Sequence, residues 1–133
     1  MISIEEDMKM EKRFYYCEIC GNMVEILDFG GGKLVCCGQK MSRLEIGTKE
    51  ASKEKHIPEI QIDGDKMKVV VGSVLHPMTE EHYIEWIELV WENKSKRIFL
   101  HPGDDPVGTF KQVKPAIVYA YCNLHGLWGI EIK

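Results

Sequence analysis

The sequence lacks any long hydrophobic run. Its longest apolar stretches, such as residues 117–121, fall far short of the roughly 20 residues that cross a membrane. The first residues carry the acids Glu5, Glu6 and Asp7 and no apolar segment of the length that a signal peptide needs. We therefore expect a cytoplasmic protein that is neither exported nor associated with a membrane.

An excess of basic charge is also missing. The 133 residues include 17 lysines and arginines against 21 aspartates and glutamates, which gives a formal net charge of -4. Such a chain has no general positive field to hold nucleic acid or an anionic membrane, and we expect neither partner. Hydrophobic residues make up 44% of the chain, enough to bury a core in one domain or in one domain with a very small second one.

The cysteines do not form the even, spaced set of a disulfide framework. There are five, and four of them cluster at Cys17, Cys20, Cys36 and Cys37, with Cys122 alone. In a cytoplasmic protein, where thiols stay reduced, such a cluster favours metal ligation. A disulfide between the adjacent Cys36 and Cys37 would form only with strain.

Residues 14–46 are short apolar bursts broken by glycines, and this segment is too small for an apolar core of its own. Below about 40 residues a folded domain usually needs an additional cross-link for stability, and a metal bound by four thiolates supplies one. Cys17-x-x-Cys20 is typical of a metal knuckle. Adjacent strand residues point to opposite faces, so the backbone must turn at Cys36-Cys37, beside Gly38, for both sulfurs to reach one ion. Four thiolates by themselves fit a structural zinc as well as iron.

The second part of the chain has a β-rich pattern. Polar residues 47–57 mark a change in composition, and we place the domain boundary here, with domains at 1–46 and 47–133. Short apolar runs follow at residues 66–75, 83–91, 97–100, 116–122 and 127–132, separated by turn signals and without a convincing helical pattern. Several short strands at this spacing predict an antiparallel β-sandwich of immunoglobulin-like type.

This part also contains a set of histidines around one cysteine. His76 and His82 flank a turn at Pro77, and Cys122 and His125 lie three positions apart at the end of an apolar run. A lone histidine is more often a surface or core residue than a ligand, but one thiolate among several imidazoles favours iron, copper or zinc over magnesium or calcium. A blue-copper site requires a methionine shortly after the histidine, and residues 126–130 contain none.

Together, these motifs resemble the desulfoferrodoxin family of superoxide reductases, specifically the two-iron type. The matching elements, in the family's order, are Cys17-x-x-Cys20, Cys36-Cys37-Gly38, Glu54-Lys55-His56-x-Pro58, His76-Pro77, His82 and Cys122-Asn123-x-His125-Gly126. They account for all five cysteines and four of the five histidines, and they leave His101 as a loop residue. The extension ahead of Cys17 departs from the family pattern.

The resemblance implies a mainly β protein in which a small rubredoxin-like (desulforedoxin-like) metal domain precedes the sandwich. It also implies two Fe ions per chain, an Fe(Cys)4 centre and an Fe(His)4Cys centre. The implied ligands are Cys17, Cys20, Cys36 and Cys37 for the first iron, and His56, His76, His82 and His125 with an axial Cys122 for the second. The sixth position of the second iron would then be open to substrate.

The activity implied by the resemblance is one-electron reduction of superoxide to hydrogen peroxide, a detoxification step under oxidative stress. The partners implied are rubredoxin or another small electron carrier as donor, and a second copy in a homodimer. Lys55 would help to collect the superoxide anion, and Glu54 would occupy the open position once the iron is ferric. Two rival hypotheses are a non-catalytic iron electron-transfer protein and a zinc-stapled β-sandwich that acts as a binding module.

Overall fold

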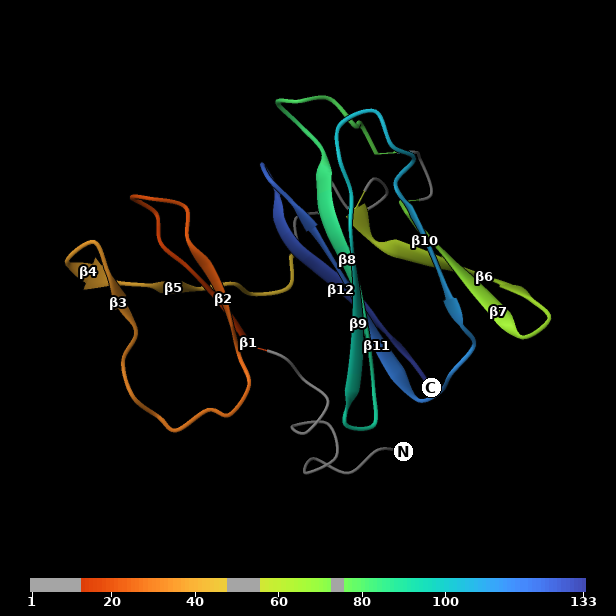
Figure 1. Cartoon of the computed structure of the whole chain (residues 1–133), viewed down its shortest axis with the longest axis horizontal. Helices are drawn as coiled ribbons and strands as arrows, with labels where there is room; N and C mark the ends of the chain where they lie inside the picture. Colours follow the sequence, from red (N-terminus) through yellow and green to blue (C-terminus); the bar gives the residue numbers. More distant parts are fainter. Residues whose placement is uncertain (1–12, 48–55, 73–75) are drawn as a thin grey trace. The chain divides into compact units, whose positions relative to one another are not determined.

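The computed structural model describes residues 13–47, 56–72 and 76–133. It divides the chain into two compact units, Met1–Glu45 and Ile46–Lys133 (Figure 1). The expected roles of Glu54 and Lys55, and the end of the run at 66–75, lie outside the described residues. Within the described ranges, no helix is long and apolar enough to cross a membrane.

The first unit consists of short antiparallel strands. Its three-stranded sheet has the order β2-β1-β5, formed by β1 (Arg13–Tyr16), β2 (Met23–Ile26) and β5 (Ser42–Arg43), and a separate hairpin pairs β3 (Val35–Cys36) with β4 (Gln39–Lys40). Of the residues described here, the buried hydrophobic ones are Phe14, Cys17 and Met41. Because so few side chains are buried, apolar packing contributes little to this unit, and a bound metal would contribute folding free energy.

The second unit is a β-sandwich of two antiparallel sheets. One sheet has the order β10-β7-β6 and the other β12-β11-β8-β9. The strands are β6 (Pro58–Asp63), β7 (Lys66–Val71), β8 (Ile84–Trp91), β9 (Lys94–Phe99), β10 (Val107–Lys111), β11 (Ala116–Cys122) and β12 (Gly126–Ile132). The prediction of a mainly β protein with antiparallel sheets is confirmed, and the five apolar runs correspond to β7, β8, β9, β11 and β12.

Strands β6 and β10 were not expected from the sequence. Both lie at the edges of the three-stranded sheet, on either side of β7. An edge strand buries fewer side chains than a central one, and most of β6 is exposed or half-buried, including Ile62. Neither strand therefore shows the continuous apolar run by which the central strands are recognised.

The core is built from alternate residues of facing strands. Met67, Val69 and Val71 of β7 belong to one buried cluster with residues of β8, β10 and β11. From β11 this cluster takes Ala116, Val118, Ala120 and finally Cys122. The last inward-facing position of a central strand is thus occupied by a cysteine, whose sulfur lies at one end of the sandwich core.

We expect this core to dominate the stability of the second unit. Ile87 is fully buried in β8, whereas Ile62 in β6 is 55% exposed. Ile87→Ala should lower the free energy of unfolding by about 2–5 kcal/mol because it leaves a cavity, and the matched change Ile62→Ala should have a much smaller effect. Denaturant unfolding followed by tryptophan fluorescence reports on this unit, because Trp86, Trp91 and Trp128 all lie within it. Equal losses in the two variants would contradict the assignment of the core.

Candidate metal centres

The four cysteines of the first unit converge on one point. Their sulfur atoms all lie within 4.8 Å of one another. The sulfur of Cys36 lies 3.6 Å from that of Cys20 and 4.0 Å from that of Cys37. Four sulfurs arranged as a tetrahedron about 2.3 Å from a metal are separated by about 3.8 Å, so the group has the dimensions of a tetrahedral thiolate site.

Two local backbone features bring these sulfurs together. Cys37 and Gly38 both have positive φ, 54° and 77°, and form the two-residue turn between β3 and β4. The turn that the adjacent cysteines require is therefore present. At the first knuckle, the Gly21 amide donates to the Cys17 carbonyl at 2.8 Å. The side chain of Asn22 donates to the Cys36 sulfur at 3.6 Å.

The sulfurs of the first group affect one another's ionisation. A hydrogen bond from the Cys20 backbone amide lowers the pKa of Cys17 to about 7. Hydrogen bonding to Cys20, and then to Cys17, raises the pKa of Cys37 to about 12. Without a cation among them, the four thiols do not all become thiolates near neutral pH. The group is thus chemically suited to a metal ion, which offsets the repulsion between four thiolates.

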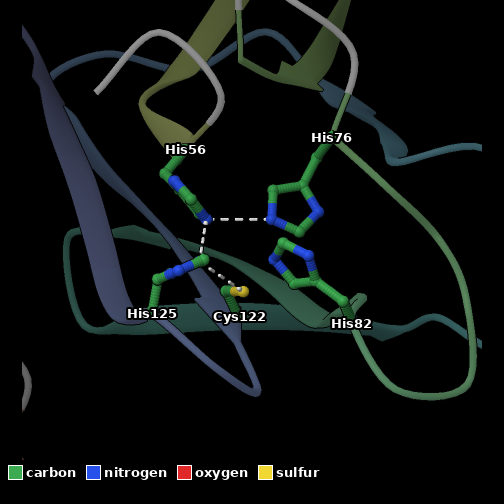
Figure 2. A group of neighbouring side chains, drawn as sticks. All are labelled: His56, His76, His82, Cys122 and His125. Atoms are coloured by element: carbon green, nitrogen blue, oxygen red, sulfur yellow. Dashed lines mark hydrogen bonds between the residues drawn. The ribbon is translucent and has the colours of Figure 1, made fainter. Parts of the chain in front are cut away.

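A second group of potential ligands lies at the end of the sandwich core (Figure 2). It contains the four histidines and the cysteine expected for the second iron, namely His56, His76, His82, Cys122 and His125, with ligand atoms within 4.8 Å of one another. His56 lies two residues before the start of β6, and Cys122 and His125 come from the β11–β12 hairpin. Segments far apart in the sequence therefore meet at one point.

The distances within the second group fit a five-ligand metal site. Nε2 of His56 lies 2.9 Å from Nε2 of His76 and 3.2 Å from Nδ1 of His125. The Cys122 sulfur lies 3.8 Å from the same Nδ1 of His125. Two nitrogens at right angles, each about 2.1 Å from a metal, lie about 3.0 Å apart. These spacings match neighbouring ligands around one ion.

The hairpin that carries Cys122 and His125 has a defined local structure. Cys122 pairs with Gly126, which leaves a three-residue loop, and Gly126 has a φ of 82° that a side chain would disfavour. On the other side of β11 the register shifts, so that Tyr121 pairs with Trp86 but Cys122 pairs with Ile84. The extra residue of this β-bulge is Glu85 on β8, opposite the step from Tyr121 to Cys122 on β11.

The hydrogen bonding of His76 prepares its ring for a metal. Its Nδ1 lies 2.7 Å from the Pro77 carbonyl oxygen, so the Nδ1–H donates there and Nε2 keeps its lone pair. Burial lowers the pKa of His76 from 6.5 to about 4, which keeps the ring neutral at physiological pH. A neutral imidazole with an available lone pair is the form that binds a metal.

The electrostatics at Cys122 also suit a buried ligand. Burial raises the pKa of the Cys122 thiol, while hydrogen bonds from the backbone amides of Leu124 and His125 lower it. A thiolate there is stable only with a positive charge close by, and a bound metal supplies that charge.

Two residues that support the histidines were not singled out from the sequence. The ring of Trp128 stacks on His56 with centroids 4.8 Å apart, and its Nε1–H donates to the His125 carbonyl at 3.1 Å. A Cβ on Gly47 would lie 2.7 Å from the Trp128 ring, so the absence of a side chain there lets the ring take this position. The sequence offers no local signal for either role, because both depend on contacts between distant segments.

The remaining histidine lies in an exposed turn. The His101 side chain is 80% exposed, and its Nδ1 lies 3.5 Å from an Asp104 carboxylate oxygen. The turn is closed by a hydrogen bond from the His101 amide to the same carboxylate at 2.8 Å. Nothing in this arrangement connects His101 to either group of ligands.

Comparison with known proteins identifies the family. Residues 48–131 match the family model for Desulfoferrodoxin, and residues 6–44 match that for the Desulfoferrodoxin N-terminal domain. The chain belongs to the desulfoferrodoxin family. A desulfoferrodoxin of Syntrophotalea carbinolica is 52% identical over 118 residues, which cover 88% of this chain and 94% of the relative.

Several matching proteins carry the name superoxide reductase, and two of them illustrate the similarity. That of Pyrococcus abyssi is 38% identical over 100 residues, covering 60% of this chain and 87% of the relative. The crystal structure of the superoxide reductase from Treponema pallidum superimposes with a TM-score of 0.71 at 31% identity, covering 90% of this chain and 97% of that one. With the family domains and the two ligand groups together, the chain fits two iron sites, one with four cysteines and one with four histidines and a cysteine.

The low pKa of His76 predicts how the metal-free protein responds to acid. Between pH 6.5 and about 4, this histidine is protonated in the unfolded chain but not in the folded one. The unfolded state then binds more protons, so stability should fall as the pH decreases through this range. We expect His76→Asn to make the pH dependence of the unfolding midpoint shallower, while His101→Asn leaves it unchanged. Identical slopes for the His76 variant and the parent protein would contradict this expectation.

Proposed function

We propose that this protein is a superoxide reductase, an oxidoreductase that converts superoxide to hydrogen peroxide. The observation that carries the proposal is the second ligand group, in which a fully buried Cys122 sulfur lies against a set of four imidazoles in a chain of the desulfoferrodoxin family. The reaction consumes one superoxide, one electron and two protons for each hydrogen peroxide. It releases no oxygen, which distinguishes it from a dismutase.

The protein's own residues prepare the second group for this chemistry. Iron bound there supplies a one-electron couple. The Pro77 carbonyl sets the tautomer of His76, and Trp128 stacks on the ring of His56 and donates to the backbone carbonyl of His125. The amides that donate to the Cys122 sulfur limit the electron density that the thiolate gives to the metal, and so adjust its redox potential.

We propose further roles for two residues outside the described ranges. Lys55 and Glu54 directly precede the ligand His56 in the sequence. A lysine at that place attracts a superoxide anion to a chain whose net charge is -4. The carboxylate of Glu54 would serve as a further ligand to the ferric ion and would so favour release of the peroxide.

The division of labour between the two domains is part of the same proposal. Residues 1–46 hold an iron that only carries electrons, and residues 47–133 hold the iron that reacts. We propose that rubredoxin or another small electron carrier returns the reacting iron to its ferrous state, and that the protein works as a cytoplasmic homodimer. A donor is necessary because each turnover consumes one electron.

Replacement of one cysteine in each group tests the central claim. Cys122→Ser should abolish superoxide reduction and the thiolate-to-iron absorption of the second centre, because the hydroxyl is a poor substitute for a thiolate. The matched variant Cys36→Ser should damage the first centre and leave superoxide reduction largely intact. Superoxide decay, peroxide yield and oxygen release are measured together. Full activity of Cys122→Ser would contradict the proposal, and absence of activity in a two-iron parent protein would favour a non-catalytic electron carrier.

The role of Lys55 predicts a dependence on ionic strength. Lys55→Ala should slow the capture of superoxide and flatten the decrease of its rate with added salt. Lys55→Arg keeps the charge and should retain the salt dependence, and Lys49→Ala serves as a control for a general change in net charge. Rates are measured after rapid mixing of the ferrous protein with superoxide. If Lys55→Ala behaves like the parent protein at all salt concentrations, Lys55 is an ordinary surface lysine.

A further inference from the structure

Asn123 connects two segments that each carry ligands of the second group. It lies between Cys122 and His125 in the β11–β12 hairpin, but its side chain reaches the residues on both sides of His82. Its Oδ1 accepts a hydrogen bond from the Tyr83 amide at 2.9 Å, and its Nδ2 donates to the Glu81 carbonyl at 3.0 Å. Its backbone amide donates to the Tyr83 carbonyl at 3.2 Å.

His82 depends on such a connection more than Cys122 and His125 do. Those two residues are held in one hairpin, whose strand register aligns them. His82 comes from a loop that is closed by its own turn, in which the amides of Thr79 and His82 donate to each other's carbonyl at 2.9 and 3.2 Å. These bonds define the shape of the loop. The pairing of Ile84 with Cys122 relates the end of the loop to the cysteine, and the bonds of Asn123 extend that connection to both neighbours of His82.

We propose that Asn123 is a positioning residue that holds the His82 ring in place relative to the Cys122 sulfur. It acts through the backbone on both sides of His82 and does not itself bind the metal. The role requires an amide, because one side chain must accept from one backbone group and donate to another. An aspartate of the same shape keeps the acceptor for the Tyr83 amide but has no donor for the Glu81 carbonyl.

The inference rests on the second group being an iron site, not on the reaction with superoxide. Loss of a residue that orients a ligand typically weakens metal binding 10–100-fold. We therefore expect Asn123→Leu to bind the second iron 10–100-fold more weakly and to change the visible absorption and paramagnetic resonance of the ferric second centre. Asn123→Asp should fall between this variant and the parent protein.

The test compares the two irons of one chain. Ferrous iron release to a chelator and the spectra of both centres are recorded for the full-length two-iron protein, and the four-cysteine centre serves as an internal reference. Asn93 lies in the exposed turn between β8 and β9, so Asn93→Leu and Asn93→Asp make the same chemical changes away from either site. Both control variants should match the parent protein in iron release and in spectra.

The outcomes separate positioning from general stability. If Asn123→Leu lowers the unfolding midpoint but leaves iron release and the spectrum of the second centre unchanged, the proposal is overturned and Asn123 is merely structural. If Asn123→Leu does not fold, Asn123→Asp decides in the same way, because it preserves the size of the side chain. If Asn123→Leu changes the spectrum of the second centre but the parent protein itself does not reduce superoxide, the positioning role is supported and only the proposed function is contradicted.

Discussion

The alternation of side chains along β11 determines where the second metal group forms. Ala116, Val118 and Ala120 point into the sandwich, so the next inward position, that of Cys122, is buried as well. The turn at Gly126 then returns His125 to the same point. All other ligands of this group approach a sulfur whose position is set by the packing of a central strand.

The two ligand groups relate to the protein's stability in different ways. The first unit buries few apolar side chains, and hydrogen bonding to neighbouring sulfurs raises the pKa of Cys36 and Cys37. A metal bound there would therefore contribute folding free energy to this unit. The second group lies at the end of a well-packed sandwich, where hydrogen bonds and an aromatic ring already orient the histidines. The second unit therefore arranges its potential ligands by packing and hydrogen bonds, whereas the first unit has little apolar packing of its own.

Central strands and metal ligands could be predicted from the sequence more easily than the remaining strands and the supporting residues. Central strands such as β8 and β11 were recognisable because burial on both faces produces continuous apolar runs. The strands β6 and β10 were missed, because neither has the continuous apolar run that marked the other strands of the sandwich. Among the site residues, cysteines and histidines were recognised by type and spacing. Trp128 was not recognised, and Asn123 appeared in a motif without a role, because a tryptophan or an asparagine has many ordinary roles and its neighbours cannot be read from its position in the chain.

The sequence by itself determined the donor atoms and their local geometry. A knuckle such as Cys17-x-x-Cys20, or a hairpin such as Cys122 to Gly126, brings its ligands together through a few backbone angles, and those angles depend on nearby residues. The tertiary structure alone decided which local pieces share a metal. His56 and His125 are 69 residues apart in the sequence, yet their nitrogens lie 3.2 Å apart. Such convergence depends on the packing of one sheet against the other, which is the sum of many weak contacts across the whole domain.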